Sequence, residues 1–309
     1  MSATEELNKY TTVDLTDYDD CIGVLEHAYC IDGVNANIRM HYLKLDGNGR
    51  PMVKALAKML YTYVIDYCLS SRNRKEPLTT RQAAKLTKEA RNLFRHPDIS
   101  GDSADKTGEA GELLLYFLIE AVLKAPQVVS KMELKTNHKD EVKGSDGIHA
   151  RFNNESGLVD FFFGESKLYQ ESSTAIAEAI KSVSDFHEIE MYQHEFTLVT
   201  KHFKYAGEAT RDAVASLIVH GEPGAGVCIN HACLIGYDFK GFNQSSVSGP
   251  PEDVLQDFLD KFSIDGTRLT KLLQSRFDKF DKKYIKFEVF FLPFPSVSEF
   301  RNEFNAALD

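Results

Sequence analysis

One strand-like segment, residues 158–168, constrains the fold of this 309-residue chain more than any other feature. Its centre carries three consecutive phenylalanines, Phe161–Phe163. Because successive side chains on a strand point to opposite sides, apolar residues here project from both faces. Such a strand is typical of the centre of a sheet that is covered on both sides. The segment therefore predicts an α/β architecture.

The order of the neighbouring elements makes this prediction more specific. Helical spacing is present at 108–123 and 173–187, and strand patterns are present at 128–135, 146–152, 158–168 and 227–237. Two further helices are expected within 188–219, helical segments near 252–262 and 268–282, a last strand at 284–292, and a terminal helix capped by Ser296. The resulting α-β-β-β-α-β order predicts a mixed sheet with helices on both faces.

The first 100 residues form a separate part of this pattern. They contain a strand-like stretch at 38–43, a helix expected from Pro51 to about Leu69, and a helix from Thr79 or Thr80 to about His96. The polar, turn-rich segment 97–106 follows, and we place a domain boundary there. The sequence thus predicts a smaller α+β region at 1–100 and a main domain at 101–309.

Composition limits the kinds of protein that this chain can be. A hydrophobic content of 43% and a charged content of 27% are typical of a folded globular protein, which excludes global disorder, collagen and coiled-coil rods. No apolar run approaches the ~20 residues that span a bilayer. The first residues are polar and acidic, so we expect a cytoplasmic protein. The net charge of −10 argues against non-specific coating of nucleic acid, but it is compatible with a local basic groove.

The cysteines and a glycine-rich segment carry no clear function of their own. The five cysteines do not follow the pattern of a disulfide framework. Cys228 and Cys233 flank His231, but these three leave a tetrahedral zinc site one ligand short, and we interpret them as core residues. Segment 220–226 lacks the Gly-Lys-Ser/Thr that binds phosphates in ATPases, and we interpret it as a turn before a strand.

Charged residues lie at the end of the central strand. Glu165 and Lys167 are two residues apart and share one side of the strand, whereas Ser166 points to the other side. A carboxylate and an ammonium at this position are unfavourable unless they are paired, metal-bound or catalytic. A purely structural interpretation is an ion pair where the strand emerges into water.

Further carboxylates favour a catalytic interpretation. Asp146 begins the neighbouring strand, and its flanking glycines allow the backbone to bring its carboxylate close to Glu165. A helix upstream adds Glu109 and Glu112, which share one helical face. Carboxylate oxygens bind hard cations such as Mg²⁺, and a nearby lysine orients water and offsets charge on a phosphate. The group therefore has the composition of a phosphodiester-cleaving site.

These residues carry a resemblance to known nucleases. A helix glutamate, then Asp146, then Glu165-Ser166-Lys167, in an α-β-β-β-α-β order, resembles the PD-(D/E)xK nuclease superfamily. The motifs Gly-Glu-Ala-Gly-Glu-Leu-Leu-Leu, Gly-Ser-Asp-Gly-Ile-His and Phe-Gly-Glu-Ser-Lys, within residues 108–167, together resemble the HamA family, the nuclease subunits of the bacterial Hachiman anti-phage defence system. The main domain at 101–309 is then expected to be a PD-(D/E)xK nuclease domain.

The resemblance implies an activity, a cofactor and a partner. It implies an Mg²⁺-dependent DNA endonuclease, with Mn²⁺ expected to substitute, that works with a superfamily 2 helicase subunit, HamB. The absence of an ATPase motif in this chain is compatible with such a division of labour. The alternative is a catalytically idle nuclease-like fold that serves as a partner-binding module.

The resemblance also assigns roles by position. Asp146 and Glu165 match the metal-binding carboxylates, Lys167 matches the catalytic lysine, and the Ser166 carbonyl is a further candidate metal ligand. Glu112 matches the helix acid best, with Glu109 as an alternative that spacing does not separate. His149 lies within the second motif and is either structural or part of the site.

Two basic segments are candidates for DNA binding. Arg81, Lys85 and Lys88 share one face of the helix expected at 79–96. Residues 268–286 are also rich in bases, among them Lys271 and Lys279. We expect the two segments to form walls of a groove that binds phosphates beside the active site. The alternative is two unrelated solvated faces.

Overall fold

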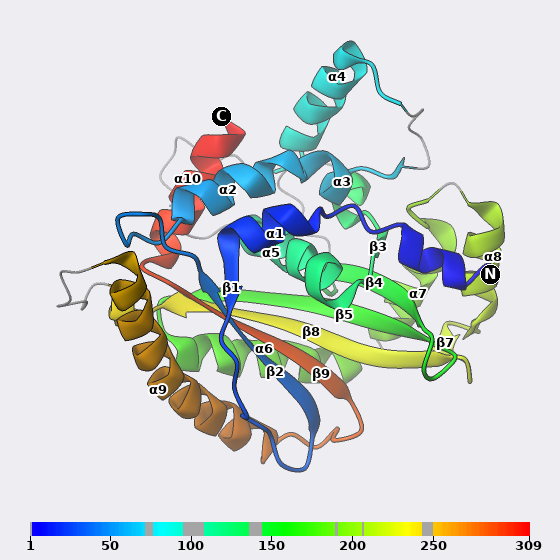
Figure 1. Cartoon of the computed structure of the whole chain (residues 1–309). Helices are drawn as coiled ribbons and strands as arrows, with labels where there is room; N and C mark the ends of the chain where they lie inside the picture. Colours follow the sequence, from blue (N-terminus) through cyan, green and yellow to red (C-terminus); the bar gives the residue numbers. More distant parts are fainter. Residues whose placement is uncertain are drawn as a thin grey trace, which may run out of the picture.

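The three phenylalanines lie in β5 (Leu158–Tyr169), an inner strand of a seven-stranded mixed sheet (Figure 1). The structure is a computed structural model, and it describes residues 2–71, 77–94, 108–135, 144–188, 191–205, 207–242 and 250–309. β5 pairs antiparallel with β4 (Gly147–Asn153) and parallel with β8 (Val227–Asp238). Phe161 and Phe163 belong to one core cluster and Phe162 to another, which confirms that both faces of β5 are covered.

The sheet has the strand order β1-β2-β9-β8-β5-β4-β3. β9 (Lys286–Phe294) is parallel to both β8 and β2 (Asn35–Leu43), β1 (Ile22–Val24) forms one edge and β3 (Gln127–Val129) the other. Strands from both sides of residue 100 thus share one sheet. The expected boundary segment 97–106 lies outside the described residues, and the division into two domains stays a prediction.

Helices of the N-terminal half and the last helix cover one face of the sheet. These are α1 (Leu15–Cys21), α2 (Val53–Thr62), α3 (Val64–Cys68), α4 (Thr80–Arg91), α5 (Glu109–Leu118) with its continuation η4 (Ile119–Leu123), and α10 (Val297–Leu308). The Thr79 side chain caps α4, and Ser296 caps α10 as expected. Figure 1 shows α4 projecting from this layer.

Two long helices, α6 (Ser172–Glu188) and α9 (Pro251–Phe277), cover the opposite face. α7 (Met191–Lys201) and α8 (Glu208–Ser216) pack against the β3–β4–β5 end of the sheet. Short elements complete the described chain: η1 (Glu5–Lys9), η5 (Lys131–Leu134), η6 (Lys240–Phe242) and the hairpin of β6 (Ile218–Val219) and β7 (Glu222–Pro223). Within these ranges no helix has both the length and the apolarity needed to cross a membrane.

The structure confirms a mixed α/β class and the element order α5, β3, β4, β5, α6, β8. It corrects three expectations. The strand expected at 128–135 ends at Val129, where the chain turns into η5 and directs Lys131 toward buried acceptors. The helix expected from Pro51 to Leu69 is divided at Tyr63 into α2 and α3. The two segments near 252–262 and 268–282 are one continuous helix, α9.

Candidate active site

Asp146 lies at the start of β4, directly beside the charged end of β5. Its backbone N–H donates to the Gly164 carbonyl at 2.8 Å. Its carboxylate Oδ2 accepts a hydrogen bond from the Ser166 N–H at 2.6 Å. Because Gly147 pairs with Gly164 in the antiparallel ladder, Asp146 is the residue opposite Glu165. The structure therefore brings these two carboxyl groups together, as the sequence predicts.

Glu165 and Lys167 form an ion pair at this end of β5. Lys167 Nζ lies 2.5 Å from Glu165 Oε1, and the side chains are 22% and 12% exposed, respectively. Burial alone would lower the pKa of Lys167, but the charges of Glu165 and Asp146 raise it overall, so the ammonium stays protonated. The pair alone also fits the purely structural interpretation. The purely structural interpretation does not account for the further carboxyl groups near this ion pair.

Helix α5 supplies this charge because it lies very close to β5. A Cβ atom on Gly111 would lie 2.4 Å from Ser166 Oγ and 3.0 Å from Leu168 Cγ, so only glycine permits this approach. The close approach brings Glu112 near Asp146. Burial raises the pKa of Asp146 well above its ordinary value, and the negative charges of Glu165 and Glu112 raise it further.

The structure distinguishes the two helix glutamates, which spacing alone did not. Glu109 forms a buried ion pair with Lys135 at 2.7 Å, with both side chains 7% exposed. Glu112 instead accepts a hydrogen bond from the buried Tyr67 hydroxyl at 3.0 Å. Burial, reinforced by the charge of Glu109, raises the pKa of Glu112. Glu112 is thus the helix acid whose charge acts on Asp146.

Sequence reasoning missed Tyr67 and Lys135 as neighbours of this site. Tyr67 lies on the apolar face of its helix, where a tyrosine is ordinarily a core residue. Lys135 follows an apolar stretch and gives no sign of its partner in sequence. Only the packing of α3 and η5 against α5 shows that both side chains contact helix acids.

His149 has a structural role in this fold. Its side chain is buried, and Nδ1 lies 2.9 Å from the Ala125 carbonyl oxygen, to which it donates. Burial lowers the pKa of His149 to about 3, so the ring is neutral at physiological pH. Its ring packs against Tyr116 of α5.

The group of Cys228, His231 and Cys233 agrees in part with the core interpretation, because His231 and Cys233 are buried whereas Cys228 is only partly buried. Its cysteines are free thiols, and His231 is buried with its Nε2 2.8 Å from Nε2 of His187. The glycine-rich segment 220–226 forms the β6–β7 hairpin and the turn before β8, in agreement with the sequence.

The oxygen donors of Asp146, Glu165 and Glu112 fit the chemistry of Mg²⁺, which prefers carboxylates. Their crowding also fits, because a bound cation would favour the ionised form of Asp146, whose pKa is raised by burial and by the charges of Glu165 and Glu112. In the described part of the chain, however, no group of three or more histidine, cysteine, aspartate or glutamate side chains is arranged to hold a metal ion. Glu165 is bound by Lys167 instead.

A cavity of about 600 Å³ lies beside Lys167, at the carboxyl end of β5. Its lining includes Ser166, Lys167, Tyr169, Thr174, Ser298 and Arg301. Arg301 of α10 donates to the Leu168 carbonyl at 2.9 Å. Two cationic side chains, Lys167 and Arg301, and the carboxylate of Glu171 therefore border a space that is open to solvent.

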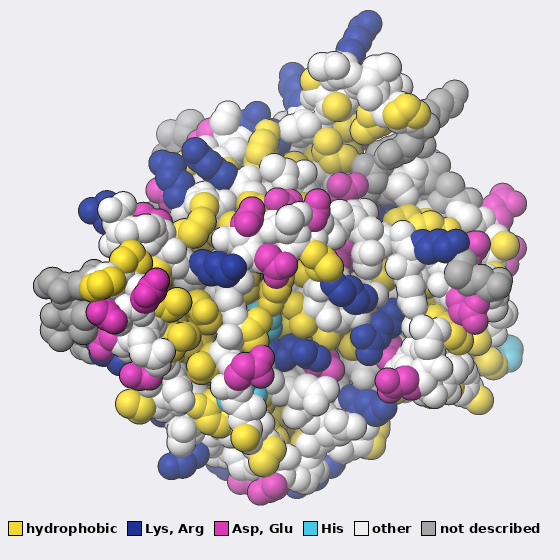
Figure 2. Space-filling model, in the orientation of Figure 1, with side chains coloured by type: hydrophobic (Ala, Val, Ile, Leu, Met, Phe, Trp, Pro, Cys, Tyr) yellow, Lys and Arg dark blue, Asp and Glu magenta, His cyan; other side chains and the backbone are white. Residues whose placement is uncertain are grey.

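The predicted DNA-binding residues lie on opposite faces of the sheet. Arg81, Lys85 and Lys88 are exposed on α4, and Figure 2 shows basic side chains at the projecting end of this helix. Lys271 on α9, and Lys279 just after it, are exposed beyond the other face. The structure does not bring the two segments together as two walls of one groove.

The residues that directly follow α4 lie beside neighbours of the helix acids. The Leu93 carbonyl, just after α4, lies 3.5 Å from Nζ of Lys135, the partner of Glu109. Phe94 packs against Tyr67, whose hydroxyl binds Glu112. The base of α4 is therefore two contacts away from the helix acids.

The model of the HamA family matches residues 19–308, nearly the whole chain. No curated protein matches the chain.

Proposed function

The chain belongs to the HamA family, a part of the Hachiman defence system, and from this premise we propose that it is the metal-dependent DNA endonuclease of that system. Its fold would be that of a PD-(D/E)xK nuclease, with α5, β3, β4, β5, α6 and β8 as the core. The phosphodiester bond would be hydrolysed at the carboxyl end of β5.

The observation that supports this proposal best is the crowding of carboxyl groups around one lysine. Asp146 lies beside Glu165, the charge of Glu112 reaches Asp146, and Lys167 is 2.5 Å from Glu165. A stable fold gains nothing from like charges in a partly buried position. Clusters of this kind are typical of functional sites, where charge is retained for chemistry.

Each residue has a role in the proposed reaction. Asp146, Glu165 and Glu112, with the Ser166 carbonyl, would hold Mg²⁺ or Mn²⁺. The bound ion supplies Lewis acidity toward the phosphate and makes a water more acidic. Lys167 stays protonated because Glu165 and Asp146 favour its charge, so its ammonium orients the attacking water and offsets negative charge that develops on the phosphate.

The cavity beside Lys167 gives the substrate a place to bind. A DNA backbone in this space would lie between Lys167 and Arg301, next to the ion pair of Lys167 with Glu165. Family membership implies a further subunit of the Hachiman system, and we propose that this partner is the helicase HamB.

A second function is favoured by one specific observation. Within the described ranges no three acidic or metal-ligating side chains are arranged to hold a metal ion, and this is also what an idle nuclease fold would show. Such a protein would serve as a partner-binding module. The activity assay below separates the two functions.

The test is cleavage of plasmid DNA by the purified chain with Mg²⁺, Mn²⁺ or EDTA, alone and with the helicase partner and ATP. Glu165→Gln and Lys167→Ala should each lower the cleavage rate by at least about 100-fold, since each removes a group from the reaction itself. Glu155→Gln, in the exposed β4–β5 turn, is the matched control and should keep the wild-type rate. If Glu165→Gln cuts as fast as the wild type, the assignment is wrong. If no arm shows metal-dependent cleavage, the partner-binding module is supported instead.

A further inference from the structure

The backbone directly before Asp146 is held on both sides by one buried ion pair. Glu195 Oε1 accepts a hydrogen bond from the Ser145 N–H at 2.8 Å. Lys131 Nζ donates to the Ser145 carbonyl at 2.6 Å. The two side chains also bind each other at 2.7 Å. We call this arrangement the Lys131–Glu195 clamp.

The clamp joins three distant elements at a single residue. Lys131 comes from η5, Glu195 from α7, and Ser145 precedes β4. The Lys131 side chain is 6% exposed and that of Glu195 is fully buried. A buried ion pair loses much of its Coulomb energy to desolvation, so it is a poor device for stability alone. Here both charges are directed at the peptide groups of the residue before Asp146.

Gly144 shows that the fold accommodates this clamp at close range. Its φ is +110°, and a Cβ at this position would lie 1.9 Å from Glu195 Oε1. No side chain fits there without displacing the glutamate. The glycine that the sequence places before Ser145 is thus required by the clamp as well as by the bend of the chain.

We propose that Lys131 and Glu195 are positioning residues, which fix the Ser145 peptide so that the Asp146 carboxylate is directed toward the metal site. This inference rests on the proposed function, because it assigns the clamp to the same site. Asp146 is tied downstream by its bonds to Gly164 and Ser166. The clamp supplies the upstream restraint, so the carboxylate is held from both directions.

Loss of the clamp should weaken metal binding more than it weakens the fold. Residues that orient metal ligands typically change affinity by about 10- to 100-fold when they are removed. Lys131→Met with Glu195→Leu replaces both charges by apolar side chains of similar size, an exchange that a buried pair often tolerates. Gly144→Ala is an independent second variant, since it keeps both charges and displaces Glu195.

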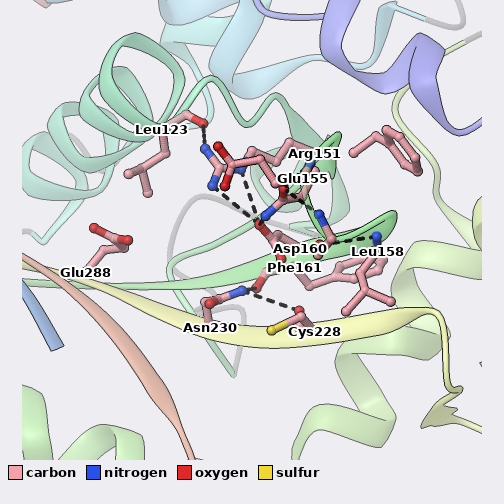
Figure 3. A network of polar contacts seen from close by, with 12 residues as sticks. Leu123, Arg151, Glu155, Leu158, Asp160, Phe161, Cys228, Asn230 and Glu288 are labelled. Carbon is pink, nitrogen blue, oxygen red and sulfur yellow. Dashed lines mark hydrogen bonds and ion pairs between the residues drawn. The ribbon is translucent and has the colours of Figure 1, made fainter. Parts of the chain in front are cut away.

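The experiment is isothermal titration of the purified full chain with Mn²⁺, with a thermal unfolding scan of each variant. Both clamp variants should raise the Kd for Mn²⁺ by about 10- to 100-fold. The matched control is Asp160→Asn, at the other end of β4 and β5 (Figure 3). Asp160 is buried and pairs with Arg151 at 3.3 Å, so its loss should lower the melting temperature and leave the Kd for Mn²⁺ within about twofold.

The outcomes separate the clamp from the function on which it rests. If the wild type binds Mn²⁺ and Asp146→Asn does not, the proposed metal site is supported. In that case, an unchanged Kd for Mn²⁺ in either folded clamp variant contradicts the positioning role of Lys131 and Glu195. A similar rise in Kd for Asp160→Asn would overturn it too, because general destabilisation would then explain the result. If the wild type does not bind Mn²⁺, or Asp146→Asn binds it equally well, the proposed metal site is wrong. The positioning role of the clamp is then wrong as well.

Discussion

Asp146 combines a functional position with an unfavourable environment. Its carboxylate keeps one strong hydrogen bond from the Ser166 N–H, yet burial and the charges of Glu165 and Glu112 raise its pKa well above the ordinary value. The ionised form is therefore less stable in the folded chain than in the unfolded one. Without a bound cation, this residue is expected to reduce stability at neutral pH.

The sign of this effect follows from linkage. Between the ordinary pKa of 3.8 and the raised folded value, the folded state binds more protons than the unfolded state, so stability falls as pH rises through this range. Asp146→Asn removes this loss and keeps an oxygen that accepts from Ser166. In EDTA at pH 7.5 it should raise the melting temperature by about 2 °C, on the order of 1 kcal/mol, and by much less near pH 4. Thermal scans at the two pH values measure this.

Asp160→Asn provides the opposite case in the same sheet. Asp160 pairs with Arg151, as Figure 3 shows, and also accepts a hydrogen bond from the Asn153 amide, so its charge is compensated. The same chemical change should there lower the melting temperature at pH 7.5. A lower melting temperature for Asp146→Asn as well would contradict the view that Asp146 is destabilising.

At the scale of elements, the contact of α5 with β5 decides where Glu112 lies. Alanine at position 111 would improve helix propensity by about 1 kcal/mol over glycine. Its Cβ, however, would lie 2.4 Å from Ser166 Oγ and 3.0 Å from Leu168 Cγ. Overlap of this size outweighs the propensity gain, and overpacking typically costs about 1–3 kcal/mol. The helix would move away from the strand and carry Glu112 with it.

Gly111→Ala should therefore lower DNA cleavage by about 10- to 100-fold, because a displacement near 1 Å is enough for such a loss. Urea unfolding should show a loss of stability of about 1–2 kcal/mol. Gly47→Ala is the control, since a Cβ at that turn position would meet nothing within 4 Å. Wild-type cleavage by Gly111→Ala would mean that the position of Glu112 does not matter.

Elements with local signals were predictable from the sequence. Strand β4, the turn before Leu158 and the Ser296 cap of α10 each depend on neighbouring residues, and each is confirmed. α9 was not predicted as one helix. Gly266 lies between the two expected segments, 252–262 and 268–282, and a glycine there resembles a helix break. A Cβ there would lie 2.6 Å from the ring of Tyr29, so this glycine serves a packing contact between residues far apart in sequence.

In the candidate site, too, contacts that depend on local spacing were predictable, and contacts between residues far apart in sequence were not. Strand spacing brings Asp146, Glu165 and Lys167 together in prediction as in the structure. The partners Lys131 and Glu195 were not found, since 64 residues separate them. Glu195 does give one weak signal of a buried partner, because it is a charged residue next to Phe196 on the buried side of its helix.

At the scale of the whole molecule, the sheet separates the two basic segments. α4 lies in the layer with α5, and its base contacts Lys135 and Tyr67 beside the helix acids. α9 lies beyond the opposite face with α6. A short duplex that reaches the candidate site from the α4 side cannot also contact Lys271 and Lys279 across the sheet. We therefore expect α4 to carry the phosphate contacts.

Salt dependence of binding tests this expectation. Each phosphate contact contributes about 0.9 to the slope of log K against log salt. Charge reversal of Arg81, Lys85 and Lys88 to glutamate should reduce that slope by up to about 3, whereas reversal of Lys271 and Lys279 should change it by less than about 1. Anisotropy of a labelled duplex of about 12 base pairs, in EDTA and over a range of salt, measures both. Equal losses from the two sets would show that DNA wraps around the molecule, and a larger loss from Lys271 and Lys279 would move the binding surface to the α9 face.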